Sequence, residues 1–286
     1  MTPRLGDATH VGAVRLQVAD AGRSLDFYRG LLGFAELGRA GGVISLGVPE
    51  SSRPLVQLVE RPGTRAIRPH GHLGLYHFAI LLPDREALGR ALLHLHRHRV
   101  PLGMADHLVS EALYLSDPDG LGIEIYRDRP RAEWRFAGGT VAMASDPLDI
   151  EGIAASAGGA AWTGMPARTV IGHVHLHVGD LTAAEAFYAD ALGFDVTARN
   201  YPGALFLSAG GYHHHLGTNT WARGARAPAP DDAQLLHWDL VVADGNEQAA
   251  VQARLRAAGV VVVPGEDGTF VVRDPFGTPL RVVAQG

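Results

Sequence analysis

Residues 11–34 read VGAVRLQVADAGRSLDFYRGLLGF, and residues 171–194, which lie 160 positions further on, read IGHVHLHVGDLTAAEAFYADALGF. Ten of these 24 aligned positions are identical. A second pair has the same offset, because YHFAILLPD at 76–84 matches LHWDLVVAD at 236–244. In addition, DPDG at 117–120 recurs as DPFG at 274–277, near the end of the second copy. Self-similarity of this kind is the signature of a repeated fold. The sequence therefore predicts two copies, about 1–130 and 168–286, with two units in each.

Each unit has the same local pattern. It opens with alternating apolar and polar residues, as in Val14, Leu16 and Val18, which is typical of a strand. An Asp that can cap a helix follows each of the four strands, at Asp20, Asp84, Asp180 and Asp244. A helix of roughly a dozen residues and several short strands complete each unit. We expect an α+β protein with four βαβββ units.

This repeat resembles the vicinal oxygen chelate superfamily, in which paired βαβββ units curl into half-open barrels around a metal. The resemblance covers nearly the whole chain and implies two half-open mixed-sheet barrels, the glyoxalase/bleomycin resistance/extradiol dioxygenase fold. We expect an N-terminal domain at 1–130 and a C-terminal domain at 168–286. The Gly-, Ala- and Ser-rich stretch 131–167 is expected to connect them across the surface.

Composition excludes several classes of protein. The 286 residues include no cysteine, so disulfides and thiolate metal sites are absent and a transition metal must be held by His and carboxylate. A net charge of -5 without a basic patch argues against a nucleic-acid partner. No apolar run is long enough for a membrane span and no signal-peptide pattern opens the chain, so we expect a cytoplasmic location. A homo-oligomer is a common state for such proteins.

Strand alternation predicts which side chains face the hollow of each barrel. In the third unit, Val174, Leu176 and Val178 form the apolar face beneath the helix, which turns His173 toward the hollow together with two further histidines at alternate positions. The same rule turns His77 and Glu124 of the second unit toward it.

The four units are unequal in possible metal ligands. The first unit has Ala13 where the third has His173, and the fourth has His237 and Arg281 where the second has His77 and Glu124. A guanidinium has no lone pair to give a metal. A complete set of two histidines and one carboxylate therefore requires units two and three to pair across the two halves. His237 remains an alternative ligand to His77, and the barrel of units one and four is expected to be structural.

A metal bound by two imidazoles and one carboxylate keeps open positions, as in non-haem Fe(II) oxygenases, whereas structural zinc sites are closed by four protein ligands. The stretch HLVSEALYLSDPDGLGIE at 107–124 adds specificity. It is similar to the extradiol ring-cleavage dioxygenase motif, with one departure at Ala105, and YRDRP at 126–130, DPLD at 146–149 and YHHH at 212–215 look like the Bacillus-type catechol 2,3-dioxygenase branch.

This resemblance implies a role for each matching residue. Glu124, His77 and His173 match the metal ligands, and His107 and Tyr114 match residues that touch the substrate or bound oxygen. The acid–base histidine falls in the run 213–215, where His214 aligns best and His215 is the alternative.

The implied function is Fe(II)-dependent cleavage of a catecholic small molecule by O₂, with Mn(II) able to occupy the same ligands. Two other functions remain open: a metal-dependent glyoxalase or isomerase of this fold, which needs a fourth ligand from near Gln57 or the triple His, and a metal-free small-molecule-binding protein.

Overall fold

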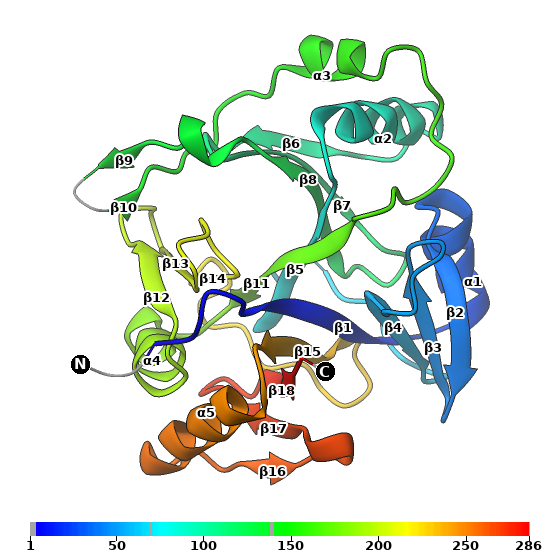
Figure 1. Ribbon diagram of the computed structural model, residues 1–286. Coiled ribbons are helices and arrows are strands. Elements are labelled where there is room, and N and C mark those ends of the chain that lie inside the picture. The colour runs from blue at the N-terminus through cyan, green and yellow to red at the C-terminus, as the bar shows by residue number, and fades with distance from the viewer. Residues whose placement is uncertain (1–3, 69, 138–139, 286) are drawn as a thin grey trace.

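The computed structural model describes residues 4–68, 70–137 and 140–285. Two eight-stranded sheets form the molecule, with helices around the outside (Figure 1). The first sheet has the order β16-β17-β18-β15-β1-β4-β3-β2, and the second has the order β12-β13-β14-β11-β5-β8-β7-β6. Both sheets are mixed, because each contains parallel as well as antiparallel strand pairs.

The strands of the first sheet are β1 (His10–Val18), β2 (Ala35–Ala40), β3 (Val43–Gly47), β4 (Val56–Glu60), β15 (Gln234–Val242), β16 (Val263–Pro264), β17 (Phe270–Arg273) and β18 (Pro279–Ala284). Those of the second are β5 (Gly74–Leu81), β6 (Gly103–Asp106), β7 (Ser110–Ser116), β8 (Gly122–Asp128), β11 (Val170–His177), β12 (Asp195–Ala198), β13 (Ala204–Ser208) and β14 (Leu216–Asn219). A small separate hairpin consists of β9 (Phe136–Ala137) and β10 (Thr140–Val141).

The expected βαβββ order is confirmed in all four units. Two of the four helices are continuous, and the other two widen into a π-helical second half that the sequence did not predict. The helical segments are α1 (Ala21–Leu25) with η1 (Asp26–Leu31), α2 (Arg85–Arg97), α4 (Leu181–Glu185) with η3 (Ala186–Ala191), and α5 (Gly245–Ala257). Outside the units lie α3 (Ile150–Ser156) and the short 3-10 turns η2 (Arg131–Glu133) and η4 (Glu266–Gly268).

The four predicted N-caps are also confirmed. Each Asp side chain accepts a hydrogen bond from a backbone N–H in the first turn of its helix, which satisfies a donor that the helix itself leaves free. The capping residues are Asp20, Asp84, Asp180 and Asp244.

Each sheet combines four strands from each half of the chain. β5 of the second unit pairs antiparallel with β11 of the third, and β1 of the first unit pairs antiparallel with β15 of the fourth. The predicted pairing of units two and three is therefore found. The limits 1–130, 131–167 and 168–286 remain a prediction for the domains, since the two halves share both sheets.

The two sheets are tied together within each half by a tyrosine from the π-helical segment. The hydroxyl of Tyr28 donates to Asp117 Oδ2 at 3.1 Å, and that of Tyr188 donates to Asp274 Oδ2 at 2.9 Å. These Asp residues open the DPDG and DPFG turns, and all four side chains are buried. The repeated sequence motifs thus have a common structural role.

The core lies between the sheets and their helices, as the alternation predicted. Val174, Leu176 and Val178 are fully buried on the helix side of β11, while the three histidines between and beside them face the hollow of the second sheet. Among the described residues, no helix is long and apolar enough to cross a membrane.

Candidate functional site

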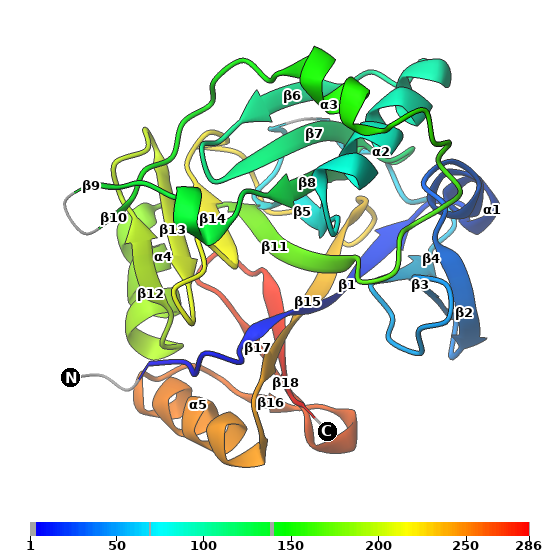
Figure 2. The ribbon, with the colours of Figure 1, turned by 45° about the horizontal axis from the view of Figure 1, so that its top comes forward.

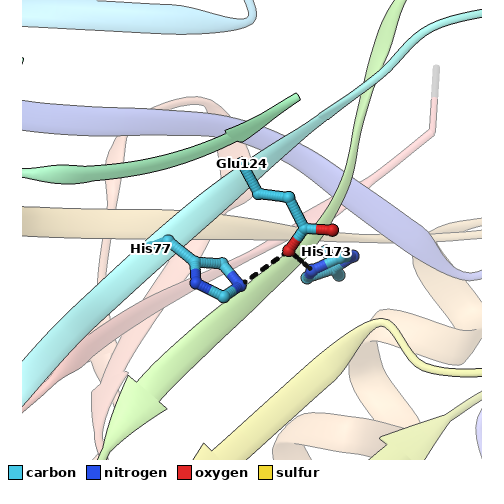
Figure 3. A group of neighbouring side chains, drawn as sticks. All are labelled: His77, Glu124 and His173. Atoms are coloured by element: carbon cyan, nitrogen blue, oxygen red, sulfur yellow. Dashed lines mark hydrogen bonds and ion pairs between the residues drawn. The ribbon is translucent and has the colours of Figure 1, made fainter. Parts of the chain in front are cut away.

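Three side chains converge in the hollow of the second sheet. His77 on β5, Glu124 on β8 and His173 on β11 meet at one carboxylate oxygen (Figure 3). Oε2 of Glu124 lies 3.0 Å from Nε2 of His77 and 3.1 Å from Nε2 of His173. Units two and three therefore bring the three predicted ligands together.

Strand register explains this geometry. His173 lies opposite Ala79, and Ala79 lies beside Glu124, so the three form one row across β11, β5 and β8. His77 is two residues from Ala79 and thus on the same face. Because the middle position of the row carries only a methyl group, the space above it is free for the longer side chains around it.

The three ligand atoms fit a divalent metal ion. At metal–ligand distances of about 2.1 Å and near-right angles, neighbouring ligand atoms lie about 3 Å apart, which matches the observed separations. The side chains are 2–5% exposed. Nδ1 of both His77 and His173 has no hydrogen-bond partner among the residues that the structure describes. Within the part of the chain that the structure describes, this is the one group of three or more His, Asp or Glu side chains whose ligand atoms all lie within 4.8 Å of one another.

The protonation states suit metal binding. Burial alone would raise the pKa of Glu124, but His173 and His77 beside it hold this pKa well below its ordinary value. Burial lowers the pKa of His77, although Glu124 opposes the shift. An ionised carboxylate and a neutral imidazole are the forms that coordinate a metal.

A cavity of about 290 Å³ opens beside the triad. The predicted residues His107, Tyr114 and His214 all line it. The ring of His214 lies 4.1 Å from that of His173 between centroids. His215 instead lines a different cavity, and its Nδ1 lies 2.9 Å from the hydroxyl of Ser208.

His107 and Tyr114 form a hydrogen-bonded pair at the cavity wall. Nδ1 of His107 lies 2.6 Å from the carbonyl oxygen of Ala144, which can only accept, so Nδ1 carries a proton. In the neutral form of this imidazole the lone pair is then on Nε2, which lies 2.6 Å from the Tyr114 hydroxyl and can accept from it. Burial and the negative charge of Glu124 raise the pKa of Tyr114 well above 10, so this hydroxyl keeps its proton. The Tyr114 hydroxyl is also within hydrogen-bond reach of Glu124, and its oxygen has lone pairs with which to accept a hydrogen bond from a bound molecule.

The segment expected to be a plain connection contributes to the cavity. Figure 2 shows the chain after β10 passing the second sheet on its way to α3. Met143 and Ser145 of this segment line the cavity, and the Ser145 hydroxyl lies 2.8 Å from that of Tyr201. Sequence reasoning missed this contribution, because loop composition does not report where a loop crosses the fold.

Aromatic and histidine side chains that the sequence did not single out complete the wall: Tyr76, His175, Tyr201, Phe206 and Trp221. Burial, together with the neighbouring histidines, lowers the pKa of His175 well below its ordinary value, so this ring is neutral. Strand alternation did predict that His175 faces the hollow, but it gave this residue no role.

A larger cavity of about 930 Å³ adjoins the first one. Tyr76, His77 and Tyr114 line both cavities, so the two meet at the candidate metal centre. Its walls include apolar side chains from strands of both sheets, such as Leu75 on β5 and Leu235 on β15, and from the segment before β6, such as Leu102.

In the first sheet, the position that corresponds to the triad holds an ion pair in place of a set of metal ligands. Arg281 lies beside Asp239 in register and donates two hydrogen bonds to it, at 2.7 and 2.6 Å. His237 is near the same carboxylate at 3.6 Å. Burial and the charge of Arg281 lower the pKa of His237 to about 3. His237 lies in the other sheet from Glu124, and so does Gln57, which accepts a hydrogen bond from Arg15.

Sequence comparison places this architecture in a known family. The profile of the Glyoxalase/Bleomycin resistance protein/Dioxygenase superfamily matches residues 9–125 and 170–282, which are the two pairs of units. The chain belongs to this superfamily. Both matched segments contribute to the triad, so the candidate metal centre lies across the two superfamily repeats.

One characterised bacterial protein is closely similar in sequence. The catechol-2,3-dioxygenase of Bacillus subtilis (strain 168) is 46% identical over 271 residues, which span 93% of this chain and 94% of that protein. Among solved structures, a Bacillus subtilis subsp. subtilis str. 168 protein has a TM-score of 0.67 at 15% identity, covering 99% of this chain and 86% of its own. Glyoxalase I from Zea mays has a TM-score of 0.58 at 17% identity, covering 97% and 92%. At such low identity the two structures establish the fold alone.

Proposed function

We propose that this protein is an Fe(II)-dependent extradiol dioxygenase, which uses O₂ to open a catecholic ring beside its two oxygens. The observation that carries the proposal is the buried His77–Glu124–His173 group in a chain 46% identical to a catechol-2,3-dioxygenase. Two imidazoles and one carboxylate leave open positions on a metal, as a reaction between two bound molecules requires.

His77, Glu124 and His173 would hold the metal. When bound there, Fe(II) would supply open positions for the catechol oxygens and for O₂ and would allow electrons to pass from the catechol to O₂. Mn(II) suits the same ligands. A glyoxalase-like site would need a fourth protein ligand, and no further His, Asp or Glu among the described residues brings a ligand atom within 4.8 Å of all three.

The chain's own residues would orient the ring and handle its protons. The 290 Å³ cavity is at the small end of the range for ligand pockets, which suits a single aromatic ring. Tyr114, held by His107, offers its oxygen as acceptor to a catechol hydroxyl. Burial and the neighbouring His173 lower the pKa of His214 well below its ordinary value, so this imidazole is neutral. A neutral imidazole has a lone pair, and His214, which lines the cavity, would use it to accept a proton of the catechol.

The adjoining cavity suggests the kind of catechol. A bare ring needs only the smaller space, whereas the 930 Å³ cavity that meets it at Tyr76 and Tyr114 can receive a substituent. Because leucines from both sheets line this space, we propose that the substrate carries a largely apolar substituent.

The test is anaerobic loading with Fe(II), followed by addition of a series of catechols and air. We expect oxygen uptake and a yellow ring-opened product, with a preference for catechols that bear apolar substituents. Parallel samples loaded with Mn(II), Zn(II) and Ni(II) identify the metal. Activity on a hemithioacetal with Zn(II) or Ni(II) and no oxygen uptake would instead indicate a glyoxalase. Binding of a catechol by protein that retains no metal would indicate a binding protein.

A further inference from the structure

Two adjacent histidines beside the candidate site, His213 and His214, form a hydrogen bond with each other. His213 and His214 follow β13 in a loop rather than a strand, so their side chains need not point to opposite faces. Nδ1 of His213 lies 2.7 Å from Nδ1 of His214. Their exposed fractions are 0% and 4%, so this contact is shielded from water.

The far side of His213 meets a carboxylate. Nε2 of His213 lies 2.8 Å from Oδ1 of Asp128, the last residue of β8. The same oxygen accepts a hydrogen bond from the Tyr212 hydroxyl at 3.2 Å, and that hydroxyl lies 2.8 Å from the hydroxyl of Tyr126. Asp128 thus anchors a chain of contacts that ends at His214 in the cavity.

The positions of the protons follow from the chemistry of the partners. An ionised carboxylate only accepts, so Nε2 of His213 carries a proton. When both imidazoles are in the neutral form, each has one donor and one acceptor nitrogen, so Nδ1 of His213 accepts from Nδ1–H of His214. In neutral His214 the lone pair then resides on Nε2, the nitrogen that the chain of contacts leaves free.

We propose that Asp128 and His213 are positioning residues that hold His214 in the tautomer with a free lone pair on Nε2. Under the proposed function, on which this role rests, that nitrogen is the one that receives the proton of the catechol. Without the carboxylate, His213 could donate through Nδ1 instead, and His214 would then present an N–H where a base is required. Outer hydrogen-bond partners of this kind fix the tautomer of site histidines in other enzymes.

Nuclear magnetic resonance of the full chain labelled with ¹⁵N-histidine tests the tautomer directly. The spectra are recorded as purified and after loading with Zn(II), which is diamagnetic, and His214 is assigned by comparison with His214→Gln. We expect the proton on Nδ1 of His214 in the unaltered protein and on Nε2 in Asp128→Asn. Asp128→Glu, which keeps the carboxylate, should retain the original tautomer. A proton on Nε2 in the unaltered protein, or an unchanged tautomer in Asp128→Asn, would overturn the proposal.

Kinetics of the Fe(II)-loaded protein provide the second measurement. Asp128→Asn should lower kcat roughly 10- to 100-fold, with little change in KM or metal content. Asp195→Asn is the matched control, because it removes an exposed carboxylate from the same sheet without contact with the cavity. If Asp128→Asn fails to fold, His213→Gln makes the same test, because His213 lies between Asp128 and His214 in this series of contacts. The magnetic resonance result needs no turnover, so it stands or falls separately from the dioxygenase activity.

Discussion

Oε2 of Glu124 lies 3.1 Å from Nε2 of His173, although these residues belong to different repeats of a duplicated chain. One repeat alone supplies at most two of the three candidate ligands. The proposed centre therefore depends on the antiparallel pairing of β5 with β11, which joins the two repeats.

Replacing Glu124 with Ala should abolish metal retention. The substitution removes the anionic ligand and leaves two neutral imidazoles, so we expect a loss of affinity greater than the roughly 10- to 100-fold typical of outer partners. Metal per chain, measured by atomic emission after gel filtration of Fe(II)- or Zn(II)-loaded protein, checks this. His237→Gln is the control, because His237 has the equivalent place in the first sheet; equal metal content in the two variants would refute the ligand assignment.

His214→Gln and His215→Gln should differ strongly in turnover. His214 lines the cavity, so its loss should lower kcat by about 100-fold or more, which is the usual contribution of a general base, while metal content is kept. His215 is hydrogen-bonded to Ser208 outside this cavity, so its variant should keep a kcat close to that of the unaltered protein. The reverse order would assign the acid–base role to His215.

Leu102→Trp should change substrate preference. The larger side chain would fill part of the 930 Å³ cavity without reaching the smaller one, since Leu102 lines only the former. We expect kcat/KM for a catechol with a long apolar substituent to fall about tenfold, because each methylene that is no longer buried costs about 0.8 kcal/mol. The kcat/KM for unsubstituted catechol should stay unchanged. Leu93→Trp, at an exposed position of α2, is the control. An equal fall for both substrates would argue against the substituent site.

The first sheet predicts a pH dependence of stability. His237 has a pKa of about 3 in the folded protein, because burial and the charge of Arg281 disfavour its protonation, against 6.5 as its ordinary value. The unfolded chain therefore binds a proton between these pH values that the folded chain does not. The contribution of neutral His237 to the free energy of unfolding is therefore fully present above pH 6.5 and is lost as the pH falls toward 3.

This dependence can be measured by urea unfolding of the metal-free protein across the acid range. His237→Gln should reduce the slope of unfolding free energy against pH by about 1.4 kcal/mol per pH unit between about pH 4 and 6. An unaltered slope in the variant would mean that His237 is already protonated in the folded protein.

Much of the fold could be predicted because its signals are local. Helix caps, strand alternation and the repeated motifs each depend on neighbouring residues, and the structure confirms them. The convergence of His77, Glu124 and His173 was also predictable, because only one pairing of units gives three residues able to ligate.

Other features depend on the path of the chain in space. The π-helical widening beside Tyr28 and Tyr188 has no local signal that we recognise. The approach of Ala144 to His107 depends on how the chain between them folds back, since the two residues are 37 positions apart. Likewise, the contact between Asp128 and His213 joins residues 85 positions apart, and no spacing rule predicts it.

The exchange of strands between repeats also sets an order of assembly during synthesis. β1 leaves the ribosome before the other described strands, yet its antiparallel partner β15 (Gln234–Val242) follows every strand of the second sheet in the sequence. The second sheet needs nothing beyond β14, which ends at Asn219. Since nascent chains fold from what has already emerged, the sheet that carries the candidate metal centre can close while the first sheet still lacks half of its strands.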